Sequence, residues 1–186
     1  MKRYRWALAG AAVATALSLG ALTTASSPAK ADGPAKTWVN QGSGKCLGVQ
    51  NGDMTNGTPV VQWTCNGHPD QSWFISTSSS SGVPDGQPTT IRNSTNPSKC
   101  LGVTASLTND GANLVIWDCL QGDLDQQWVF ENVVPPSRGI PFGCWSIENQ
   151  NALAKVVGIS GASKSDGAQA VIWDNLANTN PDQEFC

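Results

Sequence analysis

The sequence has little of what metal sites and most catalytic sites require. His68 is its only histidine, and none of its six cysteines forms a CxxC pair. A protein zinc site takes its ligands mainly from these two residue types, so the chain has almost no material for one. We therefore expect no metal ion and no cofactor.

Catalytic groups are equally scarce. His68 lies two residues before Asp70, but a Ser-His-Asp triad needs a histidine that is held by a carboxylate and bonded to a nucleophile. Sequence neighbours rarely point in that way. A carboxylate pair for glycoside hydrolysis stands once, at one scissile bond, whereas the acidic residues here recur with a repeat. We expect a protein that is not an enzyme.

The first 31 residues resemble a secretory signal peptide. A basic start, MKRYR, precedes the mostly apolar run WALAGAAVATALSLGALTTA, and an A-x-A cleavage signal stands at 29–31. A membrane anchor is the alternative, but Gly, Ser and Thr interrupt the run and a cleavage signal follows it. We predict export, with residues 32–186 forming a single secreted, extracellular domain.

Basic residues are too few in that domain for a polyanionic partner. Four of the eleven lysines and arginines and none of the fourteen acidic residues lie in the signal peptide, so residues 32–186 carry a formal charge of −7. An acidic surface repels phosphate groups. We expect neither nucleic acid nor an anionic membrane as a partner, and the size and charge are compatible with a monomer.

The chain contains an internal repeat. KCLGV occurs at 45–49 and again at 99–103, and KVVGI takes its place at 155–159. In each copy a tryptophan follows 17 positions after the second residue of this motif, and the copies start 54 and then 56 residues apart. Three such copies, about 37–75, 89–131 and 144–186, account for the secreted part of the chain.

Each copy is typical of β-structure. Asn56-Gly57, Asp110-Gly111 and Asp166-Gly167 precede the third strand of their copies, and such pairs favour type I′ turns with positive φ at both central residues. In the first copy we predict strands at about 37–41, 45–50, 59–65 and 71–75. No segment beyond the signal peptide has a sustained helical period. Twelve strands in three copies predict an all-β, pseudo-threefold β-trefoil.

A second motif ends each copy: glutamine, any residue, then a large aromatic. The aromatics can meet near a pseudo-threefold axis, so we predict that they form the core. Each glutamine is expected to hydrogen-bond backbone within its own copy. The three segments are Gln71-Ser72-Trp73, Gln126-Gln127-Trp128 and Gln183-Glu184-Phe185.

The cysteines follow the same repeat. An even number in an exported chain favours disulfides, and the spacing of 19 recurs in the first two copies. Of the 15 possible pairings, the repeat singles out one: Cys46 with Cys65, Cys100 with Cys119, and the remaining Cys144 with Cys186.

These residues carry a family resemblance over about 37–186. KCLGV…NGTPVVQWTC…DQSW and KCLGV…DGANLVIWDC…DQQW resemble the repeats of the ricin B-type β-trefoil lectins. They are similar also to the carbohydrate-binding modules of secreted actinobacterial hydrolases. The resemblance implies a non-catalytic, lectin-like protein with one shallow sugar pocket in each copy.

The resemblance also implies which residues bind the sugar. In the family an aromatic on the third strand stacks on the sugar ring, and an Asn-Gln pair lies at the end of the copy. Here an aspartate replaces that asparagine in every copy. The corresponding candidate residues are Trp63, Asp70 and Gln71; Trp117, Asp125 and Gln126; and Trp173, Asp182 and Gln183.

Two further positions depart from the family. An aspartate that accepts sugar hydroxyls is replaced by Gly48, Gly102 and Gly158, and a glutamine is replaced by Val61, Val115 and Val171. A buried sugar hydroxyl needs a hydrogen-bond partner. Our hypothesis is that the carboxylate has moved to the end of the copy, where it can reach the sugar from the other side. The alternative is that these aspartates cap turns and the tryptophans are packed.

Two segments fit the repeat poorly, 76–90 and 132–143, and we expect both to be surface loops. They suggest an alternative function, in which a trefoil without sugar binding contacts proteins or inhibits a protease through these loops.

Overall fold

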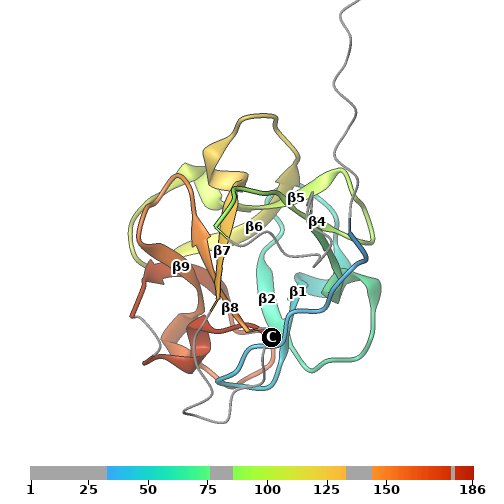
Figure 1. Ribbon diagram of the computed structural model, residues 1–186. Helices are drawn as coiled ribbons and strands as arrows, with labels where there is room; N and C mark the ends of the chain where they lie inside the picture. Colours follow the sequence, from blue (N-terminus) through green and yellow to red (C-terminus); the bar gives the residue numbers. More distant parts are fainter. Residues whose placement is uncertain (1–32, 76–85, 133–143, 177–178) are drawn as a thin grey trace, which may run out of the picture.

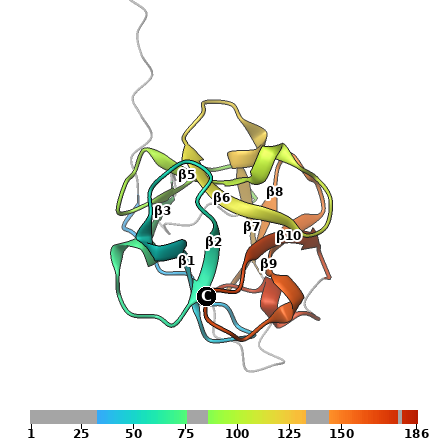
Figure 2. The ribbon, with the colours of Figure 1, turned by 180° about the vertical axis from the view of Figure 1, so that it is seen from behind.

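The computed structural model of the protein describes residues 33–75, 86–132, 144–176 and 179–186. The predicted signal peptide lies outside these residues, as does most of the two predicted loops. Within them the chain forms strands and short 3₁₀ turns, without an α-helix. The three copies form three lobes, coloured blue to teal, green to yellow and orange to red in Figures 1 and 2.

Ten strands are found in the described part of the chain. Nearly all are short, and most are buried along most of their length and not on one face alone. Their bounds are β1 Cys46–Val49, β2 Val60–Trp63, β3 Trp73–Ile75, β4 Ile91–Asn93, β5 Lys99–Val103, β6 Ala112–Asp118, β7 Trp128–Asn132, β8 Trp145–Asn149, β9 Lys155–Ile159 and β10 Ala170–Asp174.

All the pairings are antiparallel. β1 pairs with β2, and the other strands form one sheet in the order β3-β4-β5-β6-β10-β9-β8-β7. In every copy the KCLGV-type strand lies beside the strand that carries the tryptophan, with Gly48 opposite Val61, Gly102 opposite Val115 and Gly158 opposite Val171. The prediction of an all-β trefoil is confirmed.

The first predicted strand, 37–41, is wrong as a continuous strand. It forms only isolated bridges, because the segment changes partner along its length. Val39 bridges to Cys46 and Asn40 to Phe185. Phe185 bridges also to Trp145, so the two ends of the chain close the third lobe on the first.

The aromatic core agrees with the repeat. Trp73, Trp128 and Phe185 are fully buried. The indole N–H of Trp73 donates to the Leu47 carbonyl at 2.9 Å, and that of Trp128 donates to Leu101 at 3.0 Å. Each core tryptophan therefore ties the end of its copy to the KCLGV strand of the same copy, and its one polar atom is satisfied.

All three predicted disulfides are confirmed. Cys46 is bonded to Cys65, Cys100 to Cys119 and Cys144 to Cys186. The first two close loops of roughly 20 residues, a constraint on the unfolded chain worth about 3 kcal/mol each in the chain-entropy model. The third joins the C-terminal residue to the start of copy three.

The predicted type I′ turns are wrong. Gly57, Gly111 and Gly167 have positive φ, but the Asn or Asp before each does not. Its side chain instead reaches the neighbouring copy, where its Oδ1 accepts from a backbone N–H just beyond the exposed tryptophan. The three contacts are Asp118 N to Asn56 at 2.9 Å, Asp174 N to Asp110 at 2.9 Å and Thr64 N to Asp166 at 2.7 Å.

The lysine of each KCLGV-type motif completes this link between copies. It lies beside the same Oδ1 atom, with Nζ to Oδ1 distances of 2.6 Å for Lys99 and Asn56, 2.7 Å for Lys155 and Asp110, and 2.7 Å for Lys45 and Asp166. The motif that marks the repeat therefore also joins the copies in a ring.

One side chain links all three copies. Gln169 Nε2 lies 2.9 Å from the Val60 carbonyl, 3.0 Å from that of Leu114 and 2.8 Å from that of Ala170. Because these carbonyls come from copies one, two and three, Gln169 closes the pseudo-threefold arrangement at one end.

We expect Gln169→Ala to lower the free energy of unfolding by about 1–3 kcal/mol, because partly buried carbonyls lose their donor. Gln169→Glu should cost more, since it places an acceptor against acceptors. The matched control is Asn113→Ala at the equivalent, exposed position of copy two, which should change stability by less than about 0.5 kcal/mol. Equal effects of Gln169→Ala and Asn113→Ala in urea unfolding would contradict this role.

Candidate functional site

Each copy contains an open pocket with the same walls. A glycine and a valine from paired strands form its floor, a tryptophan forms one side, and an aspartate and a glutamine from a 3₁₀ turn form the other. Pocket one contains Gly48, Val61, Trp63, Asp70 and Gln71; pocket two Gly102, Val115, Trp117, Asp125 and Gln126; pocket three Gly158, Val171, Trp173, Asp182 and Gln183. Their volumes are about 250, 220 and 190 Å³.

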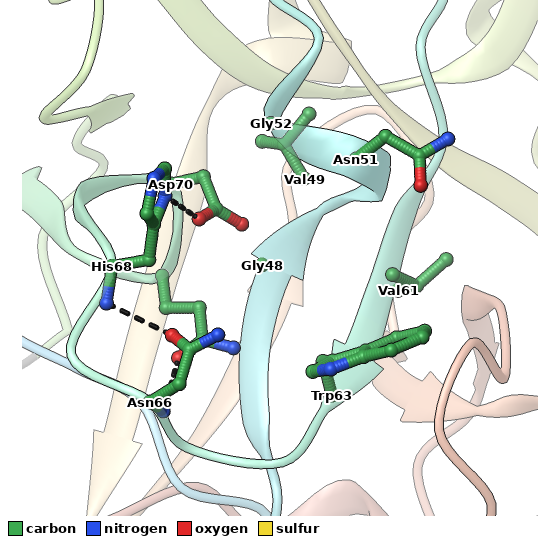
Figure 3. Close-up of a pocket in the computed structure, with 10 residues that line it drawn as sticks. Gly48, Val49, Asn51, Gly52, Val61, Trp63, Asn66, His68 and Asp70 are labelled. Carbon is green, nitrogen blue, oxygen red and sulfur yellow. Dashed lines mark hydrogen bonds and ion pairs between the residues drawn. The ribbon is translucent and has the colours of Figure 1, made fainter.

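The structure thus brings together every candidate residue predicted from the sequence. In pocket one, Trp63 and Val61 lie on one side of the strand that carries Gly48, and Asp70 lies on the other (Figure 3). The predicted shared face of Val61 and Trp63 is present.

The tryptophans are half exposed, unlike the core aromatics. Trp63, Trp117 and Trp173 have exposed fractions of 46%, 44% and 44%. The ring edge of each contacts the turn of a neighbouring copy, at Gly167, Gly57 and Gly111 respectively. Each ring is therefore held on one side by a second copy and left open on the pocket side.

The glycines leave the space that the aspartates use. A Cβ atom on Gly48 would lie 3.1 Å from Asp70 Oδ2 and 2.9 Å from Gln71 Cγ. The distances to the aspartate Oδ2 in the other copies are 3.7 Å at Gly102 and 3.3 Å at Gly158. At Gly48 and Gly158 a side chain would therefore crowd both the aspartate and the glutamine, whereas at Gly102 the crowded neighbour is the Gln126 stem, at 3.1 Å.

The pocket aspartates are strongly buried in copies two and three. Asp125 and Asp182 are 7% and 8% exposed. Asp125 Oδ2 accepts from the Ser106 hydroxyl at 3.3 Å, and Asp182 Oδ2 accepts from the Ile159 N–H at 3.3 Å. Within the described residues, Oδ1 of both has no hydrogen-bond partner. An unpaired buried acceptor is costly. The two aspartates that carry these atoms also line the open pockets.

This burial changes the acidity of two aspartates. Burial first, and then hydrogen bonding and repulsion from Asp123, raise the pKa of Asp125 to about 6. Burial also raises the pKa of Asp182 above its ordinary value. Both groups hold their proton more tightly than a carboxyl in water does.

The pocket glutamines hold the pocket in shape. Each donates from Nε2 to a carbonyl beyond the tryptophan and accepts at Oε1 from an N–H two residues further on, all within its own copy, as predicted. The donor contacts are 3.1 Å to Thr64, 3.0 Å to Asp118 and 2.9 Å to Asp174, and the acceptor contacts are 3.0 Å from Asn66, 2.9 Å from Leu120 and 3.0 Å from Leu176.

One further position lines every pocket and was not predicted as a site. Two residues before the aspartate stand His68, Asp123 and Asn180. Aligning the three copies would have found it, because it is the position beside the pocket aspartate where the copies differ most in charge.

The arrangement of His68 and Asp70 differs from the expectation that sequence neighbours rarely point toward each other. Although they are near neighbours in sequence, the ring Nδ1 of His68 contacts Asp70 Oδ1 directly (Figure 3). A triad would also need a nucleophile on the other ring nitrogen. In the described parts of the chain no serine or threonine hydroxyl hydrogen-bonds that nitrogen. Figure 3 shows instead a histidine at the pocket wall that shares a carboxylate with the site.

The Asp125 pKa predicts a specific pH dependence of stability. Because the folded pKa of about 6 exceeds the ordinary value of 3.8, the contribution of this group is full at low pH and is lost as the pH rises through about 6. Relative to wild type, Asp125→Asn should gain on the order of 2 kcal/mol between about pH 4 and pH 7. Urea unfolding at a series of pH values measures this difference. A constant difference between the two proteins would contradict the buried, proton-binding state of Asp125.

No helix in the described part of the chain is long and apolar enough to cross a membrane. No cluster of three or more His, Cys, Asp or Glu side chains there could hold a metal ion.

Comparison with known proteins identifies the fold family. Residues 27–117 match the family model described as ricin-type beta-trefoil lectin domain-like. No curated protein sequence matches the chain. The expected resemblance to the ricin-type β-trefoil lectin domains is confirmed, whereas the similarity to the modules of actinobacterial hydrolases stays a prediction.

Solved structures agree with this assignment. The designed threefold-symmetric protein ThreeFoil is 24% identical over 81% of this chain and 95% of its own, with a TM-score of 0.66. An exo-β-1,3-galactanase from Clostridium thermocellum is 26% identical over 81% of this chain and 29% of its own, with a TM-score of 0.65. The Macrolepiota procera ricin B-like lectin, in complex with lactose, is 13% identical over 82% and 94%, with a TM-score of 0.59.

Proposed function

We propose that this protein is a secreted, non-catalytic carbohydrate-binding protein that holds a glycan in up to three shallow pockets. The observation that carries the proposal is the same in each copy: a half-exposed tryptophan and an aspartate line one open pocket.

The tryptophan and the aspartate of each pocket suit two different parts of a sugar, its apolar face and its hydroxyl groups. The apolar face of a pyranose ring can pack on an indole, which offers a large, rigid apolar surface. Sugar hydroxyls can donate to the aspartate, and hydrogen bonds to a charged acceptor are stronger than neutral ones. Asp70, Asp125 and Asp182 each line a pocket and so bring a carboxylate to it.

Three weak sites can act together. When one pocket holds a polysaccharide, the next binding event becomes intramolecular, so the overall affinity can exceed that of a single pocket by orders of magnitude. The placement of one pocket in each copy favours a long or multivalent glycan over a free monosaccharide.

The relatives support a sugar ligand. The Macrolepiota lectin is described in complex with lactose and an earthworm R-type lectin in complex with GalNAc. Disulfides are typical of oxidising, extracellular compartments, and the three in this chain support the export that the leader predicts. The recurrence of acidic residues in open pockets favours binding over catalysis.

The test is retention of residues 32–186 on xylan, cellulose, chitin and immobilised galactose- or mannose-ended glycans. We expect retention on at least one of them, with release by the matching soluble oligosaccharide. Absence of retention on the whole panel by correctly folded, disulfide-bonded protein would contradict the proposal.

A further inference from the structure

The three pockets share their walls but differ in charge. The residue two positions before the pocket aspartate is His68 in pocket one, Asp123 in pocket two and Asn180 in pocket three. Pocket one therefore pairs its carboxylate with an imidazole, pocket three places an amide beside it, and pocket two contains a second carboxylate. A neutral sugar gives no reason for that second negative charge.

Pocket two lacks a cation of its own. Among the described residues, no basic side chain forms an ion pair with Asp123 or Asp125. Lys99, on the strand that forms the pocket floor, contacts Asp118 Oδ1 at 2.6 Å and Asn56 Oδ1 at 2.6 Å instead. Asp123 Oδ1 accepts from the Asp125 backbone N–H at 3.4 Å and so caps the 3₁₀ turn, but no cation offsets the repulsion between the two carboxylates.

The inner carboxylate is buried beside the pocket and lacks a hydrogen-bond partner on one of its oxygens. Asp125 is more than nine-tenths buried, it lines the pocket, and its Oδ1 has no partner in the described structure. Its pKa is raised first by burial and next by Asp123. A positive group in the pocket near both carboxylates would favour their charged forms, because it cancels the like-charge repulsion.

We infer that pocket two selects a glycan residue bearing a protonated amine, with its ring on Trp117 and its ammonium group between Asp123 and Asp125. The inference rests on the proposed function and narrows it for one pocket. The half-exposed Trp117 adds an attraction of the same sign, since an indole face attracts a nearby cation. The flat ring wall favours an amino sugar over a lysine side chain, which has no ring to stack.

Pockets one and three lack this selectivity. In pocket one the Asp70 carboxylate already contacts His68, and in pocket three Asn180 is uncharged. The amine preference is therefore a property of copy two alone.

The experiment compares two ligands that differ in whether their amine is free and charged or acetylated and neutral. Glucosamine oligosaccharides and their N-acetylated counterparts of equal length are titrated separately into ¹⁵N-labelled residues 32–186, at a neutral pH that lies above the Asp125 pKa of about 6 and below that of an amine. The indole N–H signals of Trp63, Trp117 and Trp173 report on the three pockets. We expect the Trp117 signal to titrate with at least about tenfold higher affinity for the amine, a difference of about 1.4 kcal/mol.

Isosteric variants separate the pocket from general attraction to an acidic protein. Asp123→Asn and Asp125→Asn should each remove the preference for the amine at Trp117. Glu131→Gln removes the same charge from an exposed position on β7, outside the pockets, and should leave the preference intact.

The outcomes distinguish the two proposals. Equal affinity of both oligosaccharides at Trp117 would overturn the amino-sugar inference and leave the proposed function standing. A lysine peptide that shifts Trp117 as strongly as the amino sugar would overturn it in favour of a peptide ligand. If no glycan of the panel or the titration affects any of the three tryptophans, the proposed function itself fails.

Discussion

Replacing Trp63, Trp117 and Trp173 together with alanine is expected to abolish retention on the glycan that wild-type protein binds. Each ring supplies the largest apolar surface of its pocket, and roughly half of each is open to a ligand. Residues of this kind dominate binding energies, with losses of about 2 kcal/mol or more per site. Since the pockets act together, the loss should multiply across copies.

The same variant should remain folded. The rings are only about half buried and lie outside the core, so each substitution should lower the free energy of unfolding by about 1 kcal/mol. Near-ultraviolet circular dichroism and urea unfolding test this. The Trp→Tyr triple variant is the matched control and should keep most of the retention. A folded alanine variant that is retained like wild type would show that the tryptophans do not form the binding site.

Gly48→Asp, which introduces the aspartate usual in the family, is expected to destabilise the protein. The new Cβ would lie 2.9 Å from Gln71 Cγ and 3.1 Å from Asp70 Oδ2, and the new carboxylate would stand beside an existing one. Overpacking alone costs about 1–3 kcal/mol, and like charges add to it.

The three copies provide an internal control. The distance from the added Cβ to the aspartate Oδ2 rises from 3.1 Å at Gly48 to 3.3 Å at Gly158 and 3.7 Å at Gly102. At each site Gly→Asp should destabilise the protein more than Gly→Ala does. This additional loss should be largest at Gly48, smaller at Gly158 and smallest at Gly102. Asp70→Asn should rescue much of the loss from Gly48→Asp. A neutral effect of Gly48→Asp in urea unfolding would contradict the packing described here.

Features set by spacing could be predicted from the sequence. The trefoil, the core aromatics and the disulfides all depend on residues that recur at fixed intervals, and a fixed interval in three copies leaves few ways to close one core. The pairing of Cys100 with Cys119 and the burial of Trp128 follow from that periodicity alone.

Features set by contacts between copies could not. Asn56 was expected to adopt positive φ for a type I′ turn, but its side chain satisfies Asp118 and Lys99 of the next copy, and this contact overrides the local preference. Likewise, the segment around Val39 and Asn40 forms bridges because its partners come from different parts of the chain. In both cases the neighbouring residues in the sequence do not indicate which distant segment will be contacted.

The candidate site could be predicted from the sequence only in part. Its residues could be named by alignment of the copies, and the hypothesis of a moved carboxylate came from the same alignment. That Gly48 leaves room for the Asp70 carboxylate and the Gln71 stem is a matter of a few tenths of an ångström, which spacing does not encode. The His68–Asp70 contact depends on the path of the 3₁₀ turn and could not be predicted from the sequence either.

The central claim is that each pocket takes its carboxylate from the 3₁₀ turn and not from the strand. The most direct measurement is the dissociation constant of the Asp70/Asp125/Asp182→Asn triple variant for the retained glycan, beside wild type. The account predicts an unchanged fold and binding weaker by at least about tenfold, or 1.4 kcal/mol, because the charged acceptors are gone while the shape remains. Equal affinity of the two proteins would mean that these aspartates only cap turns, and that the tryptophans bind without them.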